Sequence, residues 1–278
     1  MKIKLGFSTC PNDTFMFDAM VHGKIDTAPF EFEVVMEDIL HLNKRAREGE
    51  LDMVKISYNT FGHVWSQYKL LDAGSALGYK CGPLLISHRP LTKEQILSEQ
   101  LLVGIPGKYT TANLLLGYYF QEEIKREEML FHEIMPALTE DRIDAGVIIH
   151  ENRFTYQNFG LQLVQDLGEY WEEKTGLPIP LGAIVAHRNL GEETVGRLEE
   201  IMHQSVAYAF SHPESSTNFV KHHAQEMDPT VMQAHIDLYV NDFSLSLGDM
   251  GKKAVQKVLA TGEKMGLYPS GDSQRALT

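Results

Sequence analysis

An internal similarity constrains the fold of this chain more than any other feature of its sequence. The segment LDMVKISYN at residues 51–59 resembles IDAGVIIHE at residues 143–151, and each follows a short polar helical segment. In the same way, LGFSTCPNDTF at residues 5–15 resembles VGIPGKYTTAN at residues 103–113. Both members of this second pair run from a strand through a glycine and a polar loop into a helix. The offsets, 143 − 51 = 92 and 103 − 5 = 98, are close, so the sequence predicts two copies of one α/β pattern.

The repeat predicts an α/β fold of two lobes with a ligand cleft between them. The segments PLLISHR at residues 83–89 and GAIVAHR at residues 182–188 also resemble each other, and we expect them to be two crossing strands that act as a hinge. The larger lobe would then comprise residues 1–88 and 188–278, and the smaller lobe residues 89–187. Because clefts at domain interfaces are preferred ligand sites, we expect the functional site in that cleft.

Hydrophobic periodicity and capping signals locate the individual elements. Strands are predicted at residues 2–9, 30–36, 51–57, 68–76, 101–105, 128–134, 145–149, 161–167 and 183–187. Helices are predicted at residues 12–22, 39–48, 93–99, 112–124, 136–140, 169–174, 193–211, 215–225, 229–240 and 249–265.

Composition and charge limit the kinds of molecule that this protein is expected to bind. The net charge over 278 residues is 25 − 38 = −13, which argues against nucleic acid and anionic membranes, since both need a basic surface. An anionic small molecule remains compatible, because local dipoles can oppose the global field. Cys10 and Cys81 belong to no CxxC pair and are expected to be reduced thiols. The first residues look like a strand rather than a signal peptide, and no apolar run approaches membrane-span length, so we expect a cytoplasmic protein.

Several common catalytic and cofactor motifs are missing from the sequence. There is no HExxH and no Cys/His cluster, which argues against a zinc site. There is no GxSxG, no GxGxxG after the first strand and no P-loop spacing, which argues against an α/β-hydrolase, a dinucleotide and a nucleoside triphosphate.

The stretch DAGVIIHENRFTY contains the strongest catalytic candidate. An apolar run at residues 145–149 predicts a buried strand, and His150 follows it directly in a polar cluster. A neutral imidazole is the usual proton acceptor near neutral pH, so we expect His150 to be a general base. Glu151, Asn152, a backbone group or a water could fix its tautomer. Arg153 is expected to pair with an acidic neighbour for structural reasons.

Two predicted helix starts offer sites for an anion. Asn12 and Asp13 open one helix, and Thr110 and Thr111 open the other, with Lys108 close by. Backbone N–H groups and hydroxyls at a helix N-terminus bind carboxylates or phosphates, although threonine is also a common structural cap.

A lysine lies inside an otherwise apolar strand at Lys55, Ile56 and Ser57. Lys55 either extends its ammonium group to solvent or contacts a ligand, and the sequence favours neither. For Ser57 we favour a hydrogen bond to ligand.

Six motifs together resemble the 1,4-dihydroxy-6-naphthoate synthase family of the futalosine route to menaquinone. They span almost the whole chain, in order: STCPNDTFMF (8–17), MVKISY (53–58), LGYKCGPLL (77–85), IPGKYTTA (105–112), AGVIIHENRFTY (145–156) and TGLPIPLGAI (175–184). The resemblance implies a fold like that of type II periplasmic solute-binding proteins, with the site in the cleft. It also implies a lyase that converts cyclic dehypoxanthinyl futalosine into 1,4-dihydroxy-6-naphthoate and dihydroxyacetone without a metal or organic cofactor.

The resemblance also implies roles for individual residues. His150 corresponds to the family's catalytic base. The family's substrate-binding segments correspond to Lys55, Ile56, Ser57, Thr110 and Thr111. Two alternatives have the same fold: a chorismate dehydratase-like enzyme of the same pathway and a non-catalytic solute-binding protein.

Overall fold

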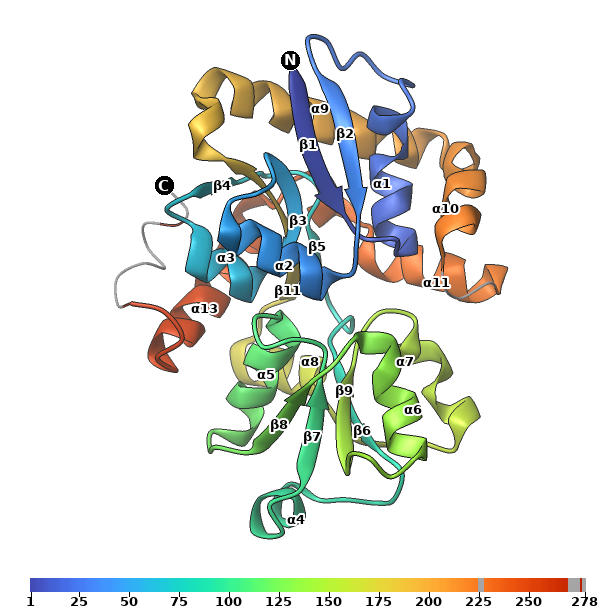
Figure 1. Cartoon of the computed structure of the whole chain (residues 1–278), viewed down its shortest axis with the longest axis vertical. Helices are drawn as coiled ribbons and strands as arrows, with labels where there is room; N and C mark the ends of the chain where they lie inside the picture. Colours follow the sequence, from blue (N-terminus) through green and yellow to red (C-terminus); the bar gives the residue numbers. More distant parts are fainter. Residues whose placement is uncertain (225–227, 270–275, 277–278) are drawn as a thin grey trace. The chain divides into compact units, whose positions relative to one another are not determined.

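In the computed structural model, which describes residues 1–224, 228–269 and 276, the chain divides into two compact units (Figure 1). Unit 1 comprises Met1–Gly78 and Pro180–Thr278, and unit 2 comprises Tyr79–Ile179. The chain therefore passes between the units before the boundaries suggested by the sequence, at 78/79 rather than 88/89 and at 179/180 rather than 187/188. Hinge motion at these crossings stays a prediction.

The segments expected to cross between lobes are each an integral strand of one sheet. Strand β6 (Leu84–Ser87) pairs with two strands of unit 2, β9 (Ala145–Ile148) and β10 (Gln162–Asp166). Strand β11 (Ile179–His187) pairs with two strands of unit 1, β3 (Met53–Ser57) and β4 (Tyr68–Leu70). Backbone hydrogen bonding thus assigns each segment to the sheet that it enters.

Unit 1 is built on a mixed sheet with the strand order β2-β1-β3-β11-β4, and β5 pairs with β11. Strand β1 runs parallel to β2 and β3, whereas β11 is antiparallel to β3. Its other strands are β1 (Lys2–Phe7), β2 (Glu31–Met36), β3 (Met53–Ser57), β4 (Tyr68–Leu70) and β5 (Ala76–Gly78). Its helices are α1 (Pro11–Val21), α2 (Ile39–Glu48), α3 (Tyr58–Val64), α9 (Glu192–Ser211), α10 (Thr217–His223), α11 (Pro229–Tyr239), α12 (Asp242–Leu245) and α13 (Gly248–Lys264). Short 3₁₀ turns lie at η3 (Arg188–Leu190) and η4 (Pro213–Ser216).

Unit 2 is built on a second mixed sheet with the strand order β10-β6-β9-β7-β8. Strand β7 runs parallel to β8 and β9, whereas β6 is antiparallel to β9. Its other strands are β7 (Leu102–Ile105), β8 (Lys125–Glu128), β9 (Ala145–Ile148) and β10 (Gln162–Asp166). Its helices are α4 (Lys93–Ser98), α5 (Thr111–Phe120), α6 (Ile134–Thr139), α7 (Asn152–Thr155) and α8 (Leu167–Thr175), with 3₁₀ turns η1 (Phe131–Glu133) and η2 (Tyr156–Phe159).

The two sheets have the same topology, as the internal similarity predicted. Read from the outer parallel strand, the order β2-β1-β3-β11-β4 in unit 1 matches β8-β7-β9-β6-β10 in unit 2. In both, the first three strands are parallel and the fourth is antiparallel to the third. The repeat in the sequence is therefore a repeat of structure.

The paired aspartates of the repeat make the same contact in each unit. Asp52 Oδ2 accepts a hydrogen bond from the backbone N–H of Lys4 at 2.8 Å. Asp144 Oδ2 accepts one from the backbone N–H of Leu102, also at 2.8 Å. Each carboxylate satisfies an N–H of the neighbouring parallel strand, at the third residue of β1 and the first residue of β7, so the repeated aspartate has the same structural role in both units.

The paired glycines of the repeat lie where a side chain would not fit. A Cβ on Gly6 would lie 2.6 Å from Leu51 Cδ1, and a Cβ on Gly104 would lie 2.6 Å from Ile143 Cδ1. In unit 1, the large apolar residue before β3 therefore packs directly on the glycine of β1. In unit 2, the residue before β9 packs in the same way on the glycine of β7.

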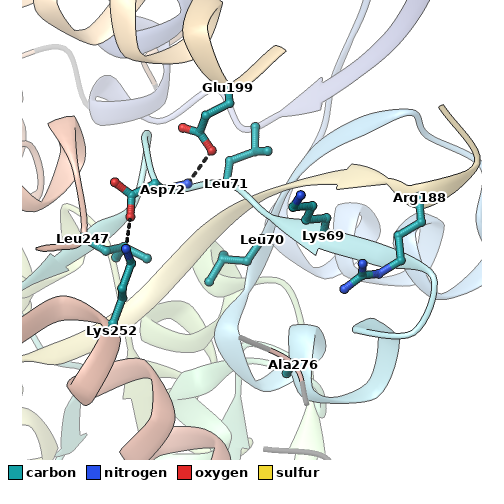
Figure 2. Close-up of a pocket in the computed structure, with 9 residues that line it drawn as sticks. All are labelled: Lys69, Leu70, Leu71, Asp72, Arg188, Glu199, Leu247, Lys252 and Ala276. Atoms are coloured by element: carbon teal, nitrogen blue, oxygen red, sulfur yellow. Dashed lines mark hydrogen bonds and ion pairs between the residues drawn. The ribbon is translucent and has the colours of Figure 1, made fainter. Parts of the chain in front are cut away.

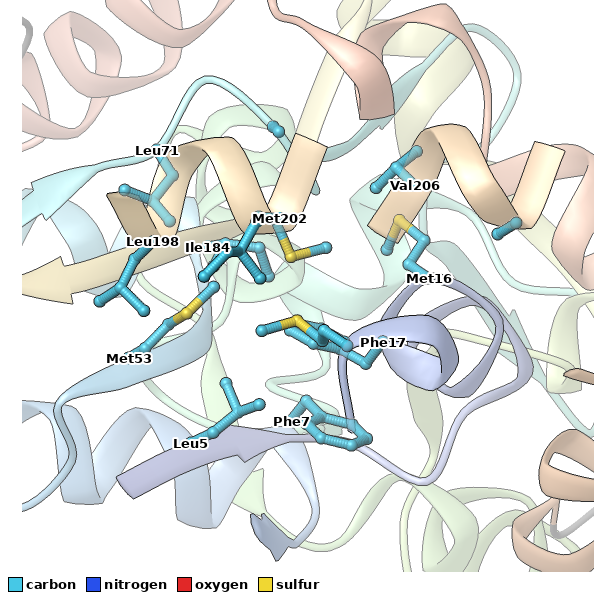
Figure 3. Packing of buried hydrophobic residues seen from close by; sticks show 14 of the residues in the cluster. Leu5, Phe7, Met16, Phe17, Met53, Leu71, Ile184, Leu198, Met202 and Val206 are labelled. Carbon is cyan, nitrogen blue, oxygen red and sulfur yellow. The ribbon is translucent and has the colours of Figure 1, made fainter. Parts of the chain in front are cut away.

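Each unit has its own apolar core. Figure 3 shows the core of unit 1, where side chains from β1, β3, α1, α9 and β11 meet. Phe7 and Phe17 stack there with ring centroids 4.4 Å apart. A second cluster in unit 2 packs α6 on the strands around it, with Ile134, Leu138 and Ile148 at its centre. In the described part of the chain, no helix is long and apolar enough to cross a membrane.

Some predicted elements are wrong. The strand expected at residues 68–76 is two short strands, and the strand expected at 128–134 is a 3₁₀ turn preceded by β8. Helix α5 ends at Phe120 rather than at 124, because Gln121 adopts a left-handed conformation with φ 58°. Residue 225, the expected end of the helix 215–225, lies outside the described residues.

Helix α3 was missed because its sequence has little helical propensity. It contains a glycine, Gly62, and β-branched residues. It forms because it packs on α13 and because Gly62 lets the ring of Tyr268 approach; a Cβ there would lie 2.5 Å from the ring.

Both cysteines are free and buried, in agreement with the predicted reduced thiols. Burial raises the pKa of the Cys81 thiol to about 12, so this thiol stays protonated near neutral pH.

Candidate functional site

In unit 1, candidate residues converge at the ends of two adjacent parallel strands. Asn12 and Asp13 lie in the first turn of α1, which follows β1, and Lys55 and Ser57 lie at the end of β3. Strands β1 and β3 are neighbours in the sheet. The carboxyl ends of parallel strands meet at one edge of a sheet, which is where open α/β folds place ligands.

Lys55 does not extend to solvent; it forms a buried ion pair. Its Nζ lies 2.5 Å from Asp13 Oδ1, and the two side chains are 5% and 2% exposed. The other oxygen of Asp13 accepts hydrogen bonds from the Ser8 N–H at 3.1 Å and the Ser8 hydroxyl at 2.7 Å. A buried ammonium group is tolerated only when it is paired in this way. The partner explains how a lysine can lie inside an apolar strand.

The stem of Lys55 is held by the neighbouring strand. Gly182 on β11 lies opposite Ser57, and a Cβ on Gly182 would lie 2.5 Å from Lys55 Cε. One N–H of the ammonium group goes to Asp13, and the described residues provide its Nζ with no second acceptor. An ammonium group has three donors, so two remain for a ligand.

Asn12 connects this ion pair to a residue that the sequence did not single out. Its Nδ2 donates to Asp13 Oδ1 at 2.9 Å. Its Oδ1 lies 2.9 Å from Nε2 of His235, a fully buried histidine on α11. His235 lies 223 residues away in the sequence, so no local pattern could have paired it with Asn12.

Ser57 is fixed by a second residue that the sequence analysis missed, Asn43 on α2. Asn43 Nδ2 donates to Ser57 Oγ at 3.0 Å, and the Ser57 N–H donates to Asn43 Oδ1 at 2.9 Å. Because the hydroxyl oxygen accepts from Asn43, the hydroxyl proton can be donated to a ligand. The available signal was a polar residue on the buried face of a helix beside Leu42 and Ala46. Ile56, between the two polar residues of β3, is fully buried in the apolar interior.

In unit 2, the two threonines open helix α5 as predicted. Thr110 is the N-cap: its Oγ1 accepts the N–H of Asn113 at 3.2 Å and donates to the carbonyl of Gly107 at 2.7 Å. Thr111 is the first helical residue and is 2% exposed. Lys108 precedes them, and its backbone N–H bonds to the carboxylate of Glu128. The capping role of Thr110 is thus confirmed.

His150 follows β9 in a left-handed backbone conformation, with φ 58°. This conformation costs a non-glycine residue roughly 1–2 kcal/mol. Backbone strain of this kind clusters at functional sites, because the surrounding structure must maintain it. The half-buried imidazole packs edge-on against Phe131, with ring centroids 4.9 Å apart and an interplanar angle of 65°.

The residues that follow His150 in the sequence make separate contacts. Arg153 donates to the carbonyl of Gly82 at 2.6 Å and to Asp166 at 2.7 Å, which confirms the predicted pairing with an acidic residue. The amide nitrogen of Asn152 donates to the carbonyl of Phe131 at 3.3 Å. Glu151 is buried, and whether it orients the imidazole stays a prediction.

The repeat places Tyr58 in unit 1 at the position of His150 in unit 2, since 150 − 58 = 92. The Tyr58 hydroxyl is hydrogen-bonded to Ser75 at 2.7 Å, and burial raises its pKa well above the usual range. Tyr58 therefore stays neutral near neutral pH. The two equivalent strand ends therefore carry chemically different side chains, a neutral phenol in unit 1 and an imidazole in unit 2.

A hollow elsewhere in unit 1 contains none of these residues. It encloses about 260 Å³ and is lined by Lys69, Leu70, Leu71, Asp72, Arg188, Glu199, Leu247, Lys252 and Ala276 (Figure 2). Lys252 lies 3.4 Å from Asp72, and the Glu199 carboxylate accepts the backbone N–H groups of residues 72 and 73. Charges lining this hollow are already paired within the fold, so we do not assign the functional site to it.

Comparison with known proteins yields a family and two curated relatives. The family model for menaquinone biosynthesis matches residues 3–264. A 1,4-dihydroxy-6-naphthoate synthase of Thermus thermophilus is 46% identical over 265 residues, covering 95% of both chains. A 1,4-dihydroxy-6-naphthoate synthase of Streptomyces coelicolor is 43% identical over 274 residues, covering 96% of this chain and 95% of its own.

Solved structures agree with the predicted fold class. A protein of Archaeoglobus fulgidus is 32% identical, with a TM-score of 0.89 over 96% of this chain and 98% of its own. A Candida albicans protein described as having the generic periplasmic binding protein fold is 10% identical, with a TM-score of 0.69 over 100% and 94% of the chains. The latter similarity concerns the fold alone. The α/β, periplasmic-binding-protein-like fold is thereby confirmed.

Proposed function

Since this chain belongs to the menaquinone biosynthesis family, we propose that it is a carbon–carbon lyase that makes 1,4-dihydroxy-6-naphthoate. The substrate we propose is cyclic dehypoxanthinyl futalosine, and the second product is dihydroxyacetone. One observation carries this proposal: two synthases named for the naphthoate product are 46% and 43% identical to the chain over nearly its whole length.

Residues of unit 2 would bind the substrate carboxylate and perform the proton transfer. The N-terminus of α5, which Thr110 caps and which begins with Thr111, is the kind of structure that binds a carboxylate. His150 would accept a proton from a substrate atom next to a carbonyl group. Cleavage of a carbon–carbon bond then forms an aromatic ring, and that aromaticity drives the reaction without a metal or organic cofactor.

Residues of unit 1 would hold the oxygen-rich part of the same substrate. The two remaining donors of the Lys55 ammonium group and the Ser57 hydroxyl proton can be given to substrate oxygens. Ile56 would contribute its backbone, because its side chain is buried. Asn12 and Asp13 stay candidates for substrate contact, and the side-chain bonds described for them hold Lys55 in place.

We also propose a cytoplasmic enzyme whose partner is a small anionic molecule rather than nucleic acid or a membrane. The net charge of −13 supports this, because polyanionic surfaces would be repelled while a single carboxylate can be held by local donors.

The decisive experiment is to incubate the purified protein with cyclic dehypoxanthinyl futalosine and to follow naphthoate formation by liquid chromatography and mass spectrometry. We expect multiple turnovers. Chorismate is the second substrate to test, and dehydration of chorismate without naphthoate formation would favour the dehydratase-like alternative. Ligand binding without turnover of either compound would favour the solute-binding alternative.

A further inference from the structure

A buried chain of hydrogen bonds runs from helix α11 to the Lys55 ammonium group. It links His235 to Asn12, Asn12 to Asp13 and Asp13 to Lys55, with distances of 2.9, 2.9 and 2.5 Å. We propose that His235 is a positioning residue that fixes the Lys55 ammonium group for substrate binding. The proposal rests on the proposed function of Lys55 as a substrate contact.

The chain has a defined direction, because the amide of Asn12 has only one acceptable orientation. Its Nδ2 must face Asp13 Oδ1, since the opposite orientation would place two acceptor oxygens 2.9 Å apart. The amide oxygen therefore faces His235, and Nε2 of His235 carries a proton and donates it. Asp13 thus sets the orientation of the Asn12 amide, and His235 holds the oxygen end of that amide in the place from which its nitrogen donates to Asp13.

Asp13 then has little freedom to move. One oxygen accepts from Asn12 and Lys55, and the other accepts from the backbone and the hydroxyl of Ser8. A carboxylate held by three other donors sets the position of its ammonium partner. Asn12 is the donor that connects Asp13 to helix α11, because His235 on that helix donates to the Asn12 amide oxygen.

The position of His235 distinguishes the positioning role from ordinary packing in the apolar core. His235 is fully buried on α11, and α11 packs on α1, the helix that carries Asn12 and Asp13 in its first turn. The ring also lies against Tyr239 with centroids 4.7 Å apart. An apolar side chain could satisfy that packing, so the packing does not require a histidine, whereas the hydrogen bond to Asn12 requires a donor.

The test compares three variants with the wild-type enzyme in steady-state turnover of cyclic dehypoxanthinyl futalosine. His235→Phe keeps an aromatic ring beside Tyr239 and removes the donor. His235→Gln keeps a donor at similar reach. Met232→Leu, on the same helix and also buried, is the matched control for packing.

We expect His235→Phe to raise KM about tenfold and to change kcat less than about twofold, because one buried hydrogen bond orients a binding group. His235→Gln should restore most of the loss, and Met232→Leu should match wild type. An equal loss in His235→Phe and His235→Gln would overturn the proposal, as would an unchanged KM in His235→Phe.

A double-mutant cycle with Asn12→Leu tests the route of the effect. If His235 acts through Asn12, then adding His235→Phe to Asn12→Leu should change KM no further. Additive changes in KM would show that His235 acts by another route and would overturn the proposal.

Crystal structures of His235→Phe and His235→Gln separate failure of this inference from failure of the proposed function. We expect the Asn12 amide and the Asp13–Lys55 pair to shift in His235→Phe, and both to keep their places in His235→Gln. Unmoved side chains in His235→Phe would contradict the positioning role whatever the substrate is. A shifted amide and ion pair in an enzyme inactive on the futalosine derivative would instead contradict the proposed function.

Discussion

At the scale of single residues, the candidate site consists of polar groups that the fold holds in place before any ligand binds. Lys55 is paired with Asp13, Ser57 with Asn43, and His150 lies in a strained backbone conformation. Preorganised donors and acceptors lose little freedom on binding, which favours affinity for the correct substrate. These arrangements lead to two predictions that separate catalysis from binding.

Replacement of His150 tests the proton transfer. His150→Asn should lower turnover of the futalosine derivative by about 10²–10⁴-fold, the usual contribution of a general base. Asparagine is chosen because it tolerates the left-handed conformation better than most residues, so the fold should survive. His88→Asn replaces an exposed histidine of the same unit and is the control. Turnover in His150→Asn close to that of wild type would contradict the assignment.

Replacement of Ser57 tests binding. Ser57→Ala should raise KM more than it lowers kcat, because the hydroxyl donates to substrate in the ground state as well as in the transition state. We expect the same pattern for Thr111→Val. Initial rates over a range of substrate concentrations measure both constants. A loss confined to kcat would instead assign these hydroxyls to the transition state.

At the scale of elements, the repeated strand–loop–helix pattern explains both the placement of the site and the need for particular small residues. Asp52 in unit 1 and Asp144 in unit 2 each accept a hydrogen bond from the backbone of the neighbouring parallel strand, β1 or β7. The glycines of β1 and β7 let the large residue before β3 or β9 approach closely. The pattern therefore makes a stability prediction that does not depend on the activity.

Gly104→Ala should destabilise the protein by about 1–3 kcal/mol, because the new methyl group meets Ile143 Cδ1 at 2.6 Å in a packed core. Adding Ile143→Val removes that atom and should recover part of the loss. Gly196→Ala on helix α9, where nothing lies within 4 Å, is the control and should be neutral or stabilising. Urea unfolding followed by circular dichroism measures all three; equal stability of Gly104→Ala and wild type would contradict this packing.

At the scale of the whole molecule, two compact units carry different parts of the proposed chemistry. Unit 1 supplies Lys55 and Ser57, and unit 2 supplies Thr110, Thr111 and His150. The proposed function therefore requires residues of both units, and the variants of His150 and Ser57 test the two sets separately.

The sequence by itself determined the features that depend on local chemistry. Alternation of apolar and polar residues, the glycine and aspartate positions of the repeat and the helix start at Thr110 all depend on neighbours in the chain. The sequence therefore predicted the α/β class and most elements, and it placed His150 just beyond a buried strand, although β9 ends at Ile148, one residue earlier than expected. Weak local preferences explain where it failed, as for α3, which is stabilised by packing on α13 and α2.

Only the tertiary structure decided which buried polar groups meet. Whether Lys55 extended to solvent or was paired depended on Asp13, 42 residues away, and the environment of Asn12 depended on His235, 223 residues away. A buried polar group needs a partner, but the partner is supplied by whichever helix packs beside it. For that reason the sequence identified candidate residues, and the packing of α1 and α11 in unit 1 determined how Lys55 is held.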